Sequence, residues 1–84
     1  MILKCGRNEI ELNDKDVILF NGVCFILMTR KIGHSFSSYS PTVSKTRMKQ
    51  LLKSGELILT KEYLDYTTSG GKEMWNRYYK VNEQ

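Results

Sequence analysis

The sequence has few of the residues on which enzymes, metal sites and disulfide frameworks depend. Its 84 residues include one histidine and two cysteines. Cys5 and Cys24 are far apart and lie in apolar surroundings, which argues against a disulfide framework and against a Cys-based metal site. His34 lies among serines in a loop with no orienting acid nearby, so it does not form a nucleophile–base pair. We therefore expect two reduced core thiols and no catalytic residue, metal ion or cofactor.

Long apolar runs are also absent. The longest, from Val17 to Met28, is interrupted by Asn21-Gly22 and falls short of the roughly 20 residues that a membrane helix needs. No export segment opens the chain, and no Asn-x-Ser/Thr glycosylation acceptor occurs in it. The sequence therefore predicts a cytoplasmic protein that does not bind a membrane.

Acidic residues are missing from the whole window between Val17 and Ser54. The same window contains six cations: Arg30, Lys31, Lys45, Arg47, Lys49 and Lys53. The whole chain has a formal net charge of only +4, so the residues outside this window are net negative. Positive charge segregated in this way favours an anionic partner.

Length and composition predict one small, ordered domain over residues 1–84. A chain with 40% hydrophobic and 26% charged residues is globular rather than disordered, although a domain of this size has a thin core. Two short strands, Met1 to Cys5 and Glu9 to Leu12, are expected around a tight loop at Gly6-Arg7-Asn8. They begin a fold that we class as α+β, with antiparallel β-hairpins in the N-terminal half.

The strongest local signal is Asn21-Gly22 between two β-prone runs, Val17 to Phe20 and Val23 to Leu27. Asn-Gly is the favoured two-residue type I′ turn, which places Phe20 opposite Val23. Both faces of this hairpin are apolar, so both should be covered. Either the helix and the C-terminal hairpin cover them within one chain, or a second copy of the chain covers one face in a homodimer.

One basic amphipathic helix is expected over residues 41–54. Ser40-Pro41 has the form of a helix start, and Ser54-Gly55 has the form of a helix end. On a helical wheel, one arc holds Ser44, Met48, Leu51 and Leu52, the opposite side holds Thr42, Thr46, Lys49, Gln50 and Lys53, and Lys45 and Arg47 lie at the seam. The helix dipole favours acidic residues in the first turn, and their absence here favours a binding role over a purely structural one.

The C-terminal third predicts a long hairpin with a flexible tip, over residues 56–81. Glu56 to Tyr66 and Glu73 to Val81 are β-prone, and the loop Thr67 to Lys72, rich in glycine and hydroxyl residues, separates them. Residues 82–84 are expected to form a disordered tail.

Residues 41–81 resemble the second half of a winged-helix DNA-binding domain. The resemblance rests on the helix, on the junction Leu51-Leu52-Lys53-Ser54-Gly55-Glu56-Leu57-Ile58 and on the Gly-tipped hairpin ending in Arg77-Tyr78-Tyr79-Lys80-Val81. It implies a recognition helix in the major groove and a β-hairpin wing on the neighbouring backbone. On the matching positions it implies groove contacts by Thr42, Lys45, Thr46, Lys49, Gln50 and Lys53, and wing contacts by Lys72 and Arg77. The residues before 41, which supply two helices in that family, are predicted here as strands.

These patterns predict a non-enzymatic protein that binds nucleic acid, with DNA favoured over RNA. Arg47 at the seam completes the cationic set, because lysine and arginine neutralise phosphates while threonine and glutamine add hydrogen bonds. An exposed Trp75 or Tyr66 would stack on unpaired bases. A different hypothesis fits the same charges: a small inhibitor or adaptor that docks its basic helix on an acidic surface of another protein.

Overall fold

A five-stranded antiparallel sheet with the strand order β5-β4-β3-β7-β6 organises the fold. The computed structural model describes residues 1–33 and 36–82. Within these residues the elements are β1 (Ile2–Cys5), β2 (Asn8–Glu11), β3 (Ile18–Phe20), β4 (Phe25–Leu27), β5 (Thr42–Val43), α1 (Lys45–Ser54), β6 (Leu57–Thr67) and β7 (Glu73–Val81). β1 and β2 form a separate two-stranded sheet. The predicted α+β class with antiparallel hairpins is thus confirmed.

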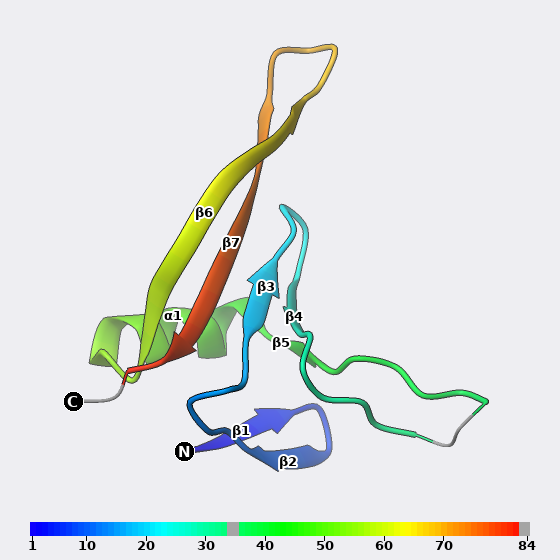
Figure 1. The fold of residues 1–84 in the computed structure, drawn as a ribbon, viewed down its shortest axis with the longest axis vertical. Helices are drawn as coiled ribbons and strands as arrows, with labels where there is room; N and C mark the ends of the chain where they lie inside the picture. Colours follow the sequence, from blue (N-terminus) through cyan, green and yellow to red (C-terminus); the bar gives the residue numbers. More distant parts are fainter. Residues whose placement is uncertain (34–35, 83–84) are drawn as a thin grey trace.

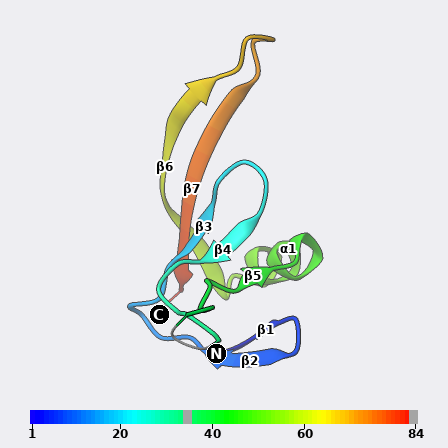
Figure 2. The same cartoon turned by 90° about the vertical axis from the view of Figure 1, so that its right-hand side faces the viewer.

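The two longest strands, β6 and β7, form an arm that projects beyond the rest of the molecule (Figure 1). The β1–β2 hairpin lies at the foot of the molecule, and α1 lies against one face of the sheet (Figure 2). No element of the described residues covers the opposite face, which we call the outer face. The sheet therefore separates a helix side from an open side.

The core lies between the sheet, α1 and the β1–β2 hairpin. All of these elements contribute side chains to it: Leu3, Cys5, Ile10, Leu12, Ile18, Leu27, Val43, Met48, Leu51, Leu57 and Tyr79. Removing one such leucine or isoleucine side chain from water stabilises the fold by about 1.5–3 kcal/mol. Cys5 is a free thiol in the core, as predicted, and burial raises its pKa. Cys24 is free as well but only half-buried.

The turn of the β3–β4 hairpin lies one residue later than predicted and is not type I′, so that prediction is wrong. The Asn21 N–H donates to the Cys24 carbonyl at 3.3 Å, which leaves Gly22-Val23 at the centre of the turn. Phe20 pairs with Phe25 rather than with Val23. The side-chain Oδ1 of Asn21 accepts hydrogen bonds from two backbone N–H groups of the turn, at 2.9 and 3.0 Å. This side-chain bonding competes with type I′ geometry, and in this turn only Gly22 takes a positive φ, 94°. Because the register changes by two residues, each side chain keeps its predicted face.

The helix α1 begins after Ser44, so the predicted start at Pro41 is wrong. Thr42–Val43 forms β5 beside β4, and the Pro41 carbonyl accepts a hydrogen bond from the Leu27 N–H at 2.8 Å. Strand pairing thus overrides the Ser-Pro signal. The side chain of Ser44 caps the helix by accepting a hydrogen bond from the backbone N–H of Arg47. The predicted end is confirmed, because Gly55 takes a left-handed conformation with φ of 84°.

The predicted C-terminal hairpin is present, but it does not cover the β3–β4 hairpin as the single-chain alternative requires. β7 pairs alongside β3, with Ile18 opposite Tyr79, so the two hairpins share one sheet. Leu19 and Ile26 therefore remain only half-buried on the outer face. The other alternative, a second copy of the chain on that face, stays a prediction.

β6 is the edge strand of the sheet, and two β-bulges interrupt its pairing with β7. The register shifts between Leu59 and Lys61 and again between Leu64 and Tyr66. An extra residue changes which side chains share a face. Lys61 and Tyr63 consequently lie on the outer face, opposite strand partners on β7.

Asn82, in the segment expected to form a disordered tail, is hydrogen-bonded to the junction of α1 and β6. Its backbone N–H donates to the Glu56 carbonyl at 2.9 Å, and its side chain donates to the Gly55 carbonyl at 3.0 Å. Residues 83 and 84 lie outside the described residues.

Asp16 is a buried carboxylate that links the β1–β2 hairpin to the sheet. It accepts two hydrogen bonds from the Arg30 guanidinium at 2.9 and 3.0 Å, one from the Thr29 hydroxyl at 2.8 Å and one from the Asn13 N–H at 3.0 Å. These donors, Arg30 foremost, hold the pKa of Asp16 well below its ordinary range. Arg30, one of the six cations in the acid-free window, is therefore neutralised within the chain.

The substitution Asp16→Asn should lower the free energy of unfolding by about 2 kcal/mol at neutral pH, because it removes charge-assisted hydrogen bonds from a buried acceptor. Urea unfolding followed by Trp75 fluorescence measures this loss. The native pKa is depressed, so the wild-type protein loses the contribution as the pH falls below the unfolded value of about 4. The two proteins should therefore converge in acid. Asp14→Asn, at an exposed neighbour, is the control, and an equal loss there contradicts the assignment.

Candidate nucleic-acid interface

The exposed side of α1 carries a row of polar and cationic side chains. Four exposed residues make up this row: Thr46, Lys49, Gln50 and Lys53. Their spacing of three and four residues places them on one side of the helix, and Met48 and Leu51 on the other side are buried. A helix of ten residues is about 15 Å long. The row is therefore a short, straight surface, as the helical wheel predicts.

The cations of α1 form no ion pair with a carboxylate of the described residues. These cations are Lys45, Arg47, Lys49 and Lys53, and the four ion pairs found in residues 1–33 and 36–82 all lie elsewhere. Glu56, the nearest acid in sequence, accepts a hydrogen bond from the Ser54 hydroxyl at 3.1 Å. The first turn of the helix has no acidic residue, so the positive end of the helix dipole adds to the field of the lysines.

Arg47 lies beside the row and is half-buried. Its Nη1 donates to Gln50 Oε1 at 3.4 Å, and its Nε is buried without a hydrogen-bond partner in the described part of the chain. Together with Lys4, Gly6 and Ser44 it lines a cavity of about 400 Å³. Sequence reasoning missed Lys4 as a neighbour of the helix, because a distant strand supplies it.

Next to the row, α1 and the β3–β4 hairpin form an apolar notch of about 230 Å³. It is lined by Phe20, Phe25, Met48 and Leu52 together with Lys45 and Lys49. The two phenyl rings lie 4.6 Å apart, centroid to centroid. The notch thus combines apolar walls with two lysines of the helix.

The wing residues are separated from the helix. Lys72 is exposed at the tip of the β6–β7 arm, at the far end of the molecule from α1 (Figures 1 and 2). Arg77 forms an ion pair with Glu62, with Nε 3.0 Å from Oε2. Thr42 lies outside the helix, in β5. The structure therefore brings the helix cations together but leaves Lys72 apart and Arg77 neutralised.

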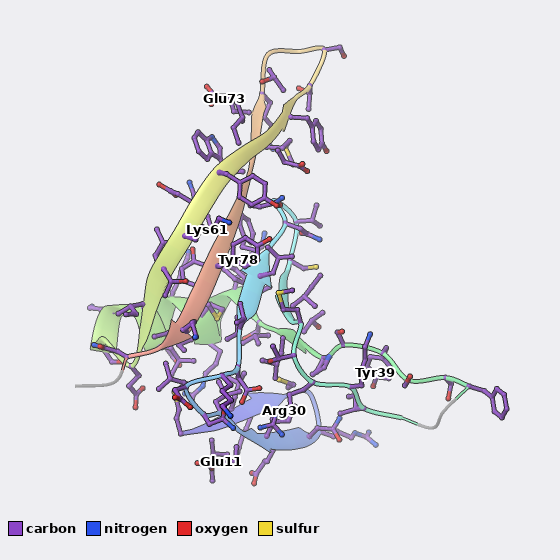
Figure 3. The ribbon with its side chains drawn as sticks, viewed as in Figure 1. Glu11, Arg30, Tyr39, Lys61, Glu73 and Tyr78 are labelled. Carbon is purple, nitrogen blue, oxygen red and sulfur yellow. The ribbon has the colours of Figure 1, made fainter. Side chains whose placement is uncertain are left out.

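The outer face carries an aromatic and cationic cluster that sequence reasoning missed (Figure 3). Tyr63 and Tyr78 have ring centroids 6.0 Å apart and hydroxyl oxygens 3.3 Å apart. Asn76 Nδ2 donates to the Tyr63 hydroxyl at 3.1 Å, and Lys61 Nζ lies 5.7 and 6.0 Å from the two centroids. A bulge hides this cluster in the sequence, because simple alternation from Leu57 places Lys61 and Tyr63 on the helix side.

Hydrogen bonds move the pKa values of the two tyrosines apart. Donors from Tyr78 and Asn76 stabilise the phenolate of Tyr63 and lower its pKa. The bond to Tyr63 raises the pKa of Tyr78, which would lose that bond on ionising. The cluster therefore holds one phenol that ionises more readily than the other.

The remaining candidates are less favourably placed. Trp75 is half-buried and its Nε1 donates to Glu73 Oε2 at 3.2 Å, whereas Tyr66 is exposed. His34 lies outside the described residues. In residues 1–33 and 36–82, no group of three or more His, Cys, Asp or Glu residues is placed to hold a metal ion. No helix in that part of the chain is long and apolar enough to cross a membrane.

Tyr63 should ionise at lower pH than Tyr78, and Asn76→Ala should raise the pKa of Tyr63 because its phenolate loses a donor. NMR titration of the tyrosine ring carbons measures both residues separately. Asn8→Ala, in the separate β1–β2 sheet, is the control and should leave both titrations unchanged. If Tyr63 titrates identically in Asn76→Ala and in the wild type, the assigned hydrogen bond is wrong.

No protein-family model matches this chain, and no curated protein or solved structure matches it either. The resemblance of residues 41–81 to a winged-helix domain stays a prediction. The chain does run helix, strand, strand from α1 to β7, while the described residues before α1 form strands and loops. The function is therefore inferred from the residues of α1 and its surroundings.

Proposed function

We propose that this protein binds nucleic acid without catalysing a reaction, and that DNA is its favoured ligand. One observation carries the proposal: the cations of α1 lack carboxylate partners among the described residues, while the other arginines near the sheet, Arg30 and Arg77, are paired. An uncompensated face of this kind attracts phosphates, and binding gains free energy from the counterions released from DNA.

The row on α1 offers two kinds of contact. Lys49 and Lys53 supply positive charge for phosphates. Thr46 and Gln50 supply hydrogen-bonding groups for the DNA backbone or for base edges. A helix about 10–12 Å across fits a major groove about 12 Å wide. The row is straight and contains no aromatic ring for stacking, which favours duplex DNA over single strands.

The β6–β7 arm would act as the wing. Lys72 at its tip supplies the cation for a neighbouring phosphate. Lys4 lies beside Arg47 but is paired with Glu9, with Nζ 4.0 Å from Oε1, so we expect little from it. We expect little from Arg77, because Glu62 already neutralises it. Thr42 belongs to β5 and would contact only the backbone beside the groove.

Binding of a labelled duplex should weaken steeply with salt. If the four cations of α1 each neutralise one phosphate, log K against log salt concentration should have a slope of about −3.6, from about −0.9 per phosphate. Fluorescence anisotropy at several salt concentrations measures the slope. Absence of binding at tens of micromolar protein in low salt would rule the proposal out.

A charge-matched pair of variants assigns the binding to α1. Lys49→Ala/Lys53→Ala should reduce the magnitude of the slope by about 1.8, because two phosphate contacts are lost. Lys15→Ala/Lys31→Ala removes the same charge from exposed positions outside α1 and should leave the slope near the wild-type value. Equal losses in both variants would mean that total charge, and not this helix, drives binding.

A further inference from the structure

We propose that the apolar notch binds one large apolar side chain, phenylalanine or leucine, from an acidic segment of another protein. The notch lies between α1 and the β3–β4 hairpin, and Lys45 and Lys49 belong both to it and to the cations of the proposed nucleic-acid interface. The inference goes beyond DNA binding and stands on the geometry of the notch.

The walls of the notch are hydrocarbon and are held by the core. Phe20 and Phe25 are partly buried and pack against the core cluster, as does Leu52, while Met48 is fully buried. The ring of Phe25 also lies 6.0 Å from that of Tyr79, centroid to centroid. These contacts to the core hold the walls of the notch in place.

The size of the notch limits its occupant. Its volume of about 230 Å³ is below the roughly 300–1,000 Å³ of pockets that enclose drug-sized ligands. One ring or one branched aliphatic side chain fills such a space, and a whole amphipathic helix does not enter it. Transfer of that side chain from water into hydrocarbon supplies the favourable free energy.

The charge beside the notch selects acidic neighbours for that side chain. Lys45 and Lys49 are exposed, lie one helical turn apart on α1, and form no ion pair with a described carboxylate. Aspartate or glutamate residues flanking the inserted side chain would reach these ammonium groups. A protein segment that alternates carboxylates with one apolar residue therefore matches both features at once.

A nucleobase fits the same notch less well, although phosphates would suit the lysines. The edges of every base carry hydrogen-bond donors and acceptors. The walls formed by Phe20, Phe25, Met48 and Leu52 contain no side-chain nitrogen or oxygen, so those groups would be left without a hydrogen-bond partner on burial, which is unfavourable. A hydrocarbon side chain carries no such penalty.

Occupation of the notch would regulate the proposed interface. Carboxylates bound to Lys45 and Lys49 remove two of the cations that phosphates would use, so the acidic segment and DNA compete. Because the coupling between two ligands is reciprocal, DNA would weaken binding of the segment by the same factor. The protein that carries the acidic segment would therefore act as an antagonist of DNA binding by α1.

The test uses the intact protein labelled with 15N and two short probes, acetyl-Asp-Phe-Asp-amide and acetyl-Asp-Ser-Asp-amide. Both carry the same charge and differ only in the central side chain. We expect the Phe probe to shift the backbone amide signals of Phe25, Met48 and Leu52, and to bind at least about fivefold more tightly than the Ser probe. Equal affinities, or shifts that avoid these three residues, overturn the proposal.

Two further measurements separate the alternatives. Thymidine monophosphate, titrated in the same way, should perturb the notch less than the Phe probe, and a stronger response at the same amides would make a nucleobase the occupant and overturn the proposal. Leu52→Ser should abolish the preference for Phe over Ser, whereas Lys53→Ser, outside the notch on the same helix, should keep it. The signal dispersion of each variant shows whether it folds, and the comparison of the two probes on the wild type needs no variant.

The outcome is independent of the DNA experiment. If duplex binding is present and the two peptides bind equally, the nucleic-acid function stands and the notch proposal falls. If the Phe probe is preferred and no duplex binds, the reverse holds. When both bind, excess Phe probe should raise the apparent dissociation constant for DNA, and the Ser probe should do so less.

Discussion

The pairing of β3 with β7 holds the two halves of this protein together. Ile18 lies opposite Tyr79 in that pairing, and each belongs to a hairpin that would be marginally stable by itself in water. α1 depends on the resulting sheet, because a ten-residue helix is too short to be stable in isolation. Its side chains Met48 and Leu51 are buried. The cationic row and the notch therefore exist only when the hairpins have joined.

Features governed by neighbouring residues could be predicted from the sequence. The helix end at Gly55, the buried positions Met48 and Leu51 and the long C-terminal hairpin follow from left-handed glycine, helical periodicity and β-propensity. The absence of acids in the first helical turn could also be read directly. These signals were sufficient to identify the exposed row on α1, because a helical wheel needs only the correct phase.

Features governed by distant residues could not be predicted. Pro41 suits a helix start and also a strand end, and only the pairing of β5 with β4 decides between them. Asn21 suits two positions in a two-residue turn, and its side-chain hydrogen bonds stabilise the turn that begins after it. The ion pair of Arg30 with Asp16 depends on a contact between two connecting segments. The placement of Lys61 beside two tyrosines depends on a bulge. The notch arises likewise from two elements that the chain brings together only on folding.

The irregular edge of the arm has a consequence for self-association. An edge strand of 11 residues with Leu59 and Leu64 exposed would ordinarily template cross-β growth from one molecule to the next. The two bulges break the even ladder of free N–H and C=O groups, and the charges of Lys61 and Asp65 lie along the same strand. A flat strand from another molecule cannot match this edge over its length. The bulges and charges thus disfavour fibril growth from this edge, although the arm is long and projects from the rest of the molecule.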